Sequence, residues 1–124
     1  MLANNVAAWF EIPTLDLERA TRFYESVLGV KLQRESMGAM RMAIFPHAMP
    51  NNSGAVVSAE GYRPATEGTV VYLNLAQDLA GPLARVEKAG GKVLLGKTAL
   101  PGDQGFFAQF LDGDGNRVGF YSAH

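Results

Sequence analysis

The chain of 124 residues contains no cysteine, and this absence excludes several kinds of protein. Without thiols it can form neither a disulfide scaffold nor a cysteine-ligated zinc or iron–sulfur centre, and it has no thiol nucleophile. A composition of this kind fits a reducing compartment. At roughly 100–200 residues per domain, the length predicts a single domain over residues 1–124.

An excess of charge of one sign is also missing. Eleven Lys and Arg residues against 12 Asp and Glu residues give a net charge of −1, so we expect no nucleic-acid partner and no anionic membrane surface as a partner. No apolar run approaches the ~18 residues of a membrane span, and residues 1–5 lack the basic and apolar regions of a signal peptide. We therefore expect a soluble, cytoplasmic protein.

What the sequence does contain is an internal repeat. Identical residues stand 62 positions apart at several places, among them Asp16 and Asp78, Leu17 and Leu79, Glu25 and Glu87, and Gly29 and Gly91. This offset is half of the chain. Two related halves, module one at about 1–62 and module two at about 66–124, are the simplest explanation. Chance matching of common residues is the alternative.

Each half predicts the same order of elements, β-α-β-β-β. In module one we expect strands at 6–13, 30–35, 39–45 and 53–59, and in module two at 69–75, 92–98, 105–111 and 117–122. Apolar residues at helical spacing follow the first strand of each module: Leu17, Ala20, Tyr24 and Val27, then Leu79, Leu83, Val86 and Ala89. Asp16 and Asp78 are expected to cap these two helices at their N-termini.

Alternation along the strands assigns their two faces, because neighbouring residues of a strand point to opposite sides. The residues expected to pack under the helices are Phe10 and Ile12, Val71, Leu73 and Leu75, and Val118 and Phe120. The opposite faces mix aromatic and polar side chains: Trp9, Glu11 and Pro13, Val70, Tyr72 and Asn74, and Arg117, Gly119 and Tyr121. Such a mixture is typical of a ligand pocket, and a sheet that faces solvent is the alternative.

Two other patterns carry no chemistry. The segment Asp112-Gly113-Asp114-Gly115-Asn116 is similar to the start of a calcium loop, but it has Arg117 and Ala123 where such a loop needs glycine and glutamate. We interpret it as a hairpin turn. The serines of the chain have no His and Asp pattern nearby that would predict a hydrolase triad.

Motifs over nearly the whole chain carry a family resemblance. Module one has Trp-Phe-Glu-Ile-Pro at 9–13 and Phe-Tyr at 23–24, and module two has Tyr-Leu-Asn at 72–74 and Gly-Asn-Arg at 115–117. This set resembles the vicinal-oxygen-chelate superfamily of glyoxalases, bleomycin-resistance proteins and extradiol dioxygenases. The resemblance implies an α+β fold in which two βαβββ modules form half-barrel sheets around a central cavity. The residues expected to line that cavity are Trp9, Glu11, Tyr72, Asn74, Gln109 and Tyr121.

The resemblance also raises the question of a metal ion. Enzymes of this superfamily typically bind one divalent ion through His, Glu or Gln on the first and last strands of the modules. The aligned positions here hold Trp9, Val70 and Gly119, whose side chains cannot coordinate a metal, and residues 53–59 contain no His, Gln or Glu. The two histidines, His47 and His124, lie at no ligand position. We therefore predict no metal and no cofactor.

Glu11 is the one acidic residue in the middle of an apolar strand, and it shares a face with Trp9. A carboxylate in a partly apolar cavity is a candidate acid, base or cation anchor, so Glu11 is the best candidate for a catalytic residue. The alternative is a structural carboxylate, hydrogen-bonded to a neighbouring strand with Tyr72 or Asn74 as its partner. The sequence leaves both open.

Three functions follow from these observations. The first is a metal-independent small-molecule-binding protein of the bleomycin-resistance type, with an unknown ligand. The second is a glyoxalase-like lyase, isomerase or dioxygenase that acts on a small organic substrate. The third is a structural or regulatory subunit with an empty cavity. The resemblance further implies a homodimer.

Overall fold

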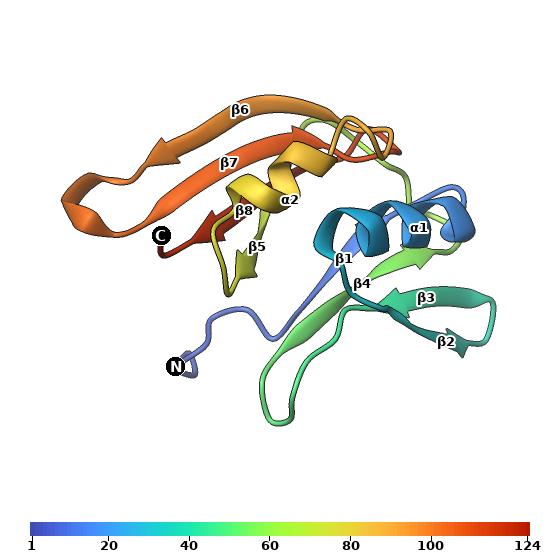
Figure 1. Ribbon diagram of the computed structural model, residues 1–124. Helices are drawn as coiled ribbons and strands as arrows, with labels where there is room; N and C mark the ends of the chain where they lie inside the picture. Colours follow the sequence, from blue (N-terminus) through green and yellow to red (C-terminus); the bar gives the residue numbers. More distant parts are fainter.

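The computed structural model describes residues 1–124 and consists of two βαβββ modules (Figure 1). Module one contains β1 (Trp9–Pro13), α1 (Leu17–Leu28), β2 (Gln33–Met37), β3 (Met40–Ile44) and β4 (Ser53–Ser58). Module two contains β5 (Val71–Leu75), α2 (Ala80–Arg85), β6 (Lys92–Ala99), the 3₁₀ turn η1 (Pro101–Asp103), β7 (Phe106–Leu111) and β8 (Arg117–Ser122). The α+β fold class and the order of elements predicted from the sequence are confirmed.

The two sheets have the same topology. Their strand orders are β1-β4-β3-β2 and β5-β8-β7-β6. In each sheet the first strand of the module runs parallel to the last, and the other pairs are antiparallel. This shared topology is what two related halves predict. It also leaves β1 and β5 as edge strands, each with one side unpaired in its own sheet.

The helix α1 begins and ends where the local sequence indicates. The side chain of Asp16 accepts a hydrogen bond from the backbone N–H of Arg19 at 3.1 Å, so it caps the N-terminus as predicted. Gly29 ends the helix in the left-handed conformation, with φ 69°, which a residue without a side chain adopts at little cost.

The second helix is shorter than predicted. Only Ala80–Arg85 is helical, and the residues up to Gly90 form turns. Gly81 and Pro82 fill part of its single complete turn, and both are poor helix formers. The N-cap of α2 is Leu79 rather than Asp78, although the Asp78 carboxylate accepts from the Ala80 N–H at 2.9 Å. The prediction of a helix through Ala89, capped by Asp78, was wrong in these two respects.

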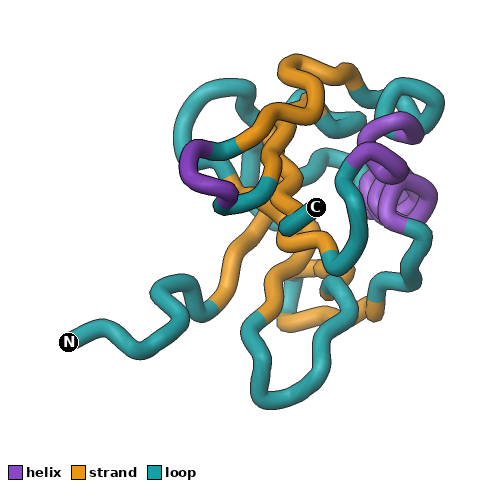
Figure 2. Tube along the Cα trace, turned by 60° about the vertical axis from the view of Figure 1, so that its left-hand side comes forward, coloured by secondary structure: helices purple, strands orange, loops and turns teal.

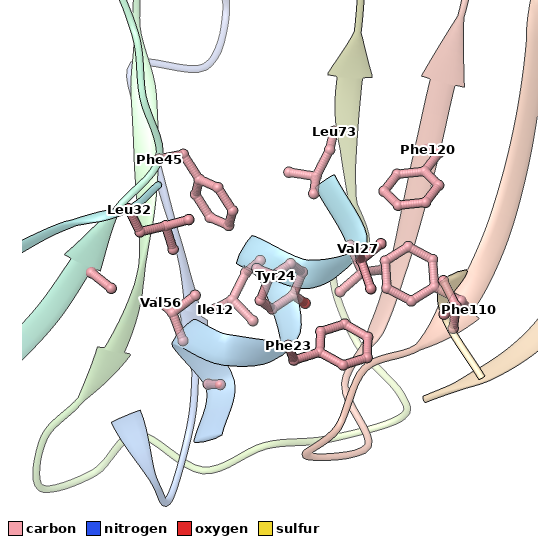
Figure 3. Packing of buried hydrophobic residues seen from close by; sticks show 14 of the residues in the cluster. Ile12, Phe23, Tyr24, Val27, Leu32, Phe45, Val56, Leu73, Phe110 and Phe120 are labelled. Carbon is pink, nitrogen blue, oxygen red and sulfur yellow. The ribbon is translucent and has the colours of Figure 1, made fainter. Parts of the chain in front are cut away.

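The main core lies around α1, between the two sheets (Figure 3). The ring of Tyr24 lies 5.5 Å from the ring of Phe45 of module one, and the ring of Phe23 lies 6.3 Å from that of Phe110 of module two. The predicted core faces of β1, β5 and β8 all contribute to this cluster or pack against it. The face assignment is therefore confirmed. The opposite face of each sheet, which points away from this core, is called its open face below.

The segment between β7 and β8 is a hairpin turn that also joins the modules. The buried Asp112 carboxylate accepts a hydrogen bond from the Tyr24 hydroxyl at 2.7 Å. Asp114 accepts from Thr14 at 2.8 Å and from Arg19 at 2.6 Å. The carboxylates of Asp112 and Asp114 both accept hydrogen bonds from protein donors, which agrees with the interpretation of this segment as a turn.

The N-terminal residues before β1 lead away from the body of the molecule as a loop (Figure 2). The long connection between β3 and β4 also projects from it in both views. The two helices have 12 and 6 residues, and no helix of this structure has the length and apolar character to cross a membrane.

Candidate functional site

The open face of module one centres on Glu11. Its register partner on β4 is Ala55, and next to it Pro13 pairs with Val57. Ala55, Val57 and Met42 form a small buried cluster on this face, against which Ile44 and Tyr62 pack. The Glu11 carboxylate therefore stands beside an apolar floor on the side of the sheet away from α1.

Two aromatic side chains hold this carboxylate. The Tyr62 hydroxyl donates to Glu11 Oε1 at 2.6 Å, and the Trp9 indole Nε1–H donates to Glu11 Oε2 at 3.2 Å. The hydrogen bond to Glu11, more than partial burial or the negative charge itself, raises the pKa of the Tyr62 hydroxyl above its ordinary value. Two neutral donors thus fix the position of the carboxylate and leave its charge unpaired.

The partners of Glu11 differ from those expected. Neither Tyr72 nor Asn74 bonds to it, and its actual partner Tyr62 lies 51 positions away, just beyond β4. Sequence reasoning missed Tyr62 because strand alternation assigns no direction to a residue outside a strand. The only signal was its closeness to the end of β4, which is the neighbour of β1.

The open face of module two carries a chain of polar contacts. The Gln109 amide Nε2 donates to the Tyr72 hydroxyl at 2.6 Å, and Arg117 Nη1 donates to Gln109 Oε1 at 2.9 Å. Gln109 and Phe107 are two residues apart in β7 and share this face. The ring of Phe107 packs edge-on against Tyr72, with ring centres 6.2 Å apart.

Tyr72 also covers Gly119. The two residues are register partners on β5 and β8. A Cβ atom placed on Gly119 would collide with the Tyr72 ring. The space beside Gly119 is thus filled by an aromatic ring from the neighbouring strand.

An open groove of about 1870 Å³ runs between the two modules. Edge strands β1 and β5, the end of α1, the start of α2 and the N-terminal segment border it. Trp9, Tyr72 and Asn74 line the groove, and Trp9 and Tyr72 are 42% and 41% exposed. Most other polar side chains along it are carboxamides, from Asn4, Asn5, Asn51, Asn52 and Gln77.

The six residues predicted for one cavity are divided by the structure. Trp9, Tyr72 and Asn74 meet in the groove, whereas Glu11, Gln109 and Tyr121 lie outside it. Glu11 adjoins the groove through its hydrogen bond from Trp9, and Gln109 does so through its hydrogen bond to Tyr72. The Tyr121 hydroxyl donates a hydrogen bond to the Gln104 carbonyl at 2.7 Å, and Tyr121 has no hydrogen bond to any of the other five predicted residues.

The side chains present do not fit a metal ion of the kind that the resemblance implies. No three His, Asp or Glu side chains come close enough together to hold one. At the aligned position Gly119, a glutamate side chain would meet the ring of Tyr72. The carboxylate of Glu11, to which Trp9 donates, has the two hydrogen bonds described above.

Comparison with known proteins extends these observations. The chain matches the model of the Glyoxalase/Bleomycin resistance protein/Dioxygenase superfamily over residues 6–120. A glyoxylase-like domain-containing protein from Didymella fabae is 31% identical over 121 residues, which are 94% of this chain and 92% of the relative.

Solved structures with this fold include two of particular interest. TnmS3, an antibiotic binding protein from Streptomyces sp. CB03234, is 26% identical, with a TM-score of 0.69 and 98% of both chains covered. Glyoxalase I from Zea mays is 24% identical, with a TM-score of 0.65. This chain covers 45% of the maize enzyme, so it spans about half of that protein's length.

The fold defines a protein built from two βαβββ modules with an open groove between them. The family match over most of the chain and the 31% identical relative place it within that class. The chain belongs to the Glyoxalase/Bleomycin resistance protein/Dioxygenase superfamily.

Proposed function

We propose that this chain binds a small organic molecule in the groove between its modules and uses no metal ion to do so. The observation that carries the proposal is that Trp9 of module one and Tyr72 and Asn74 of module two border the same open groove. Two exposed aromatic rings offer apolar area to a ring-containing ligand. The carboxamides beside them can donate to and accept from its polar atoms.

One of the similar proteins supports this reading. TnmS3, which resembles this chain over 98% of both lengths, is an antibiotic binding protein. Antibiotic binding is therefore a role that this fold performs in a protein with 26% identity to this chain.

The metal-independent part of the proposal rests on the residues themselves. Trp9 and Val70 offer no ligand atom in their side chains, and Gly119 has none. We expect elemental analysis of the untagged protein to find no stoichiometric metal and chelator treatment to leave ligand affinity unchanged. One tightly held divalent ion per chain, lost on Glu11→Gln, would overturn this part.

Trp9 is the only tryptophan of the chain, so its fluorescence and its indole N–H resonance report directly on the groove. Benzyl alcohol, benzamide, benzoate and benzylamine, each titrated separately, should reveal which ring compounds perturb both signals. Tyr72→Ala and Asn74→Ala should weaken that binding. Leu94→Ala removes an exposed apolar side chain of β6 away from the groove and should not.

Equal effects of all three variants, or no response of Trp9 to any compound, would contradict binding in the groove. Chemical turnover of a bound compound would instead favour the lyase, isomerase or dioxygenase alternative. Glu11 would then be the candidate acid or base.

We also infer that the chain forms a homodimer and acts in the cytoplasm. The sheets end in edge strands with unpaired backbone groups, among them β2 and β6, and association would cover such edges. Sedimentation at micromolar concentration should give twice the chain mass of 13.3 kDa, and a species of single mass alone would count against the dimer. The absence of cysteine suits a reducing compartment, and cell fractionation tests the location.

A further inference from the structure

The Glu11 carboxylate has no positive partner in the protein. The five ion pairs of the structure use other carboxylates, and no Lys, Arg or His nitrogen lies within 4.0 Å of Glu11. Its two hydrogen-bond donors, Tyr62 and Trp9, are both neutral. The group is only partly exposed, so water compensates its charge incompletely.

The surroundings keep basic side chains away from this carboxylate. Arg34 and Arg41, on neighbouring strands of the same sheet, are directed to the other face, where both pair with Glu18 of α1. Arg117 of module two is held by Gln109 and by the Thr66 carbonyl. The floor beside Glu11 is apolar, from Met42, Ala55 and Val57.

We propose that Glu11, Trp9 and Tyr62 form a subsite for a cationic group of an organic ligand, a protonated amine or a quaternary ammonium. The carboxylate supplies the opposite charge, and the two aromatic rings can contact alkyl groups on nitrogen through cation–π and apolar interactions. A single carboxylate whose polar neighbours are a phenol and an indole that donate to it suits an organic cation and not a metal ion, which needs several oxygen or nitrogen ligands. This inference rests on the proposed function and names the chemical class of its ligand.

The position of Trp9 connects this subsite with the groove. Trp9 lines the groove, and its indole N–H donates to Glu11. A ligand that lies against Trp9 in the groove can therefore extend a cationic substituent to the carboxylate. Its uncharged rings would remain beside Tyr72 and Asn74, which line the same groove.

The test compares two probes that differ in charge, benzyltrimethylammonium and benzyl alcohol. Both are titrated into the full chain while the Trp9 indole N–H resonance is followed. Wild type should bind the cation about tenfold more tightly than the alcohol, which corresponds to about 1.4 kcal/mol. Glu11→Gln keeps the side-chain shape and an acceptor for Tyr62, and it should remove this preference by weakening the binding of the cation, with a much smaller effect on the alcohol.

A matched control is available on the same open face. Glu35 pairs with Met42 on β3, so its side chain shares the face of Glu11, but β2 lies three strands away from β1. At about 4.8 Å per strand this is roughly 14 Å. Glu35→Gln should leave the affinity for the cation unchanged.

The outcomes distinguish the cation subsite at Glu11 from ligand binding in the groove. If the alcohol binds wild type and depends on Tyr72, but Glu11→Gln leaves the cation affinity unchanged or lowers both affinities equally, the subsite is wrong and groove binding stands. If neither probe perturbs Trp9 in the folded wild type, both proposals are overturned. A circular dichroism melt of each variant establishes that it is folded, and Glu11→Asp, which keeps the charge, should retain part of the preference.

Discussion

The ring of Tyr72 on β5 lies over Gly119, its register partner on β8, on the open face of module two. No side chain larger than hydrogen fits at position 119 while the ring keeps this place. The same ring is held by a hydrogen bond from Gln109. Close packing between a ring and a backbone thus occupies the position where the family resemblance aligns a metal-binding glutamate.

This relationship predicts a coupled stability effect. Gly119→Ala should lower the free energy of unfolding by about 1–3 kcal/mol, because the added methyl group must displace the Tyr72 ring. In a Tyr72→Ala background the same substitution should cost much less. Urea denaturation of the four proteins of this double-mutant cycle measures the coupling. An equal cost in both backgrounds would show that the ring is not the obstacle.

The hydrogen bond between Tyr24 and Asp112 should be a main connection between the modules. Burial, followed by the neighbouring charge of Asp112, raises the pKa of Tyr24 well above its ordinary value, so the hydroxyl stays protonated and donates. Tyr24→Phe should lower the free energy of unfolding by about 1.5–3 kcal/mol, because a buried carboxylate loses a donor.

Tyr121→Phe is the matched control for this change. It also removes one hydroxyl that donates, but to the exposed Gln104 carbonyl at the surface. Its effect on urea denaturation should be clearly smaller. Comparable losses in the two variants would contradict a special role for the buried pair.

Alkaline pH should weaken the contact between Tyr62 and Glu11. The hydrogen bond to Glu11 raises the pKa of Tyr62 above 10.0 in the folded chain. The stabilisation that it provides is therefore fully present below pH 10 and is lost as the pH rises through the folded-state pKa. A carbon-13 titration of labelled tyrosine measures this pKa directly. In Glu11→Ala it should return toward 10, whereas Glu35→Gln should leave it raised.

The cap of α1 offers a local test of helix stability. Asp16 accepts from the Arg19 N–H, and Asp16→Ala should lower the free energy of unfolding by about 0.5–2 kcal/mol. Asp16→Asn keeps an acceptor oxygen at the same place and should recover most of that loss. Thermal unfolding followed by circular dichroism distinguishes the two. If the asparagine variant loses as much stability as the alanine variant, the negative charge of Asp16, and not its hydrogen bond to the Arg19 N–H, stabilises the helix.

Local sequence was sufficient for the properties that depend on near neighbours. Alternation within β1 placed Trp9 and Glu11 on one side and Ile12 on the other, because the strand period is two whatever the strand packs against. The capping of α1 by Asp16 and its end at Gly29 are likewise decided within one turn of helix. The order of elements in each module followed from the same short-range signals.

Only the tertiary structure decided which side chains meet. Tyr62 reaches Glu11 across 51 positions and Tyr24 reaches Asp112 across 88, contacts that no local pattern encodes. The placement of the two sheets around α1 brings Trp9, Tyr72 and Asn74 to one groove and leaves Glu11 beside it. Strand alternation determines the side of the sheet to which a side chain points. Its partners depend on how the two sheets and α1 pack together, and that packing involves the whole core.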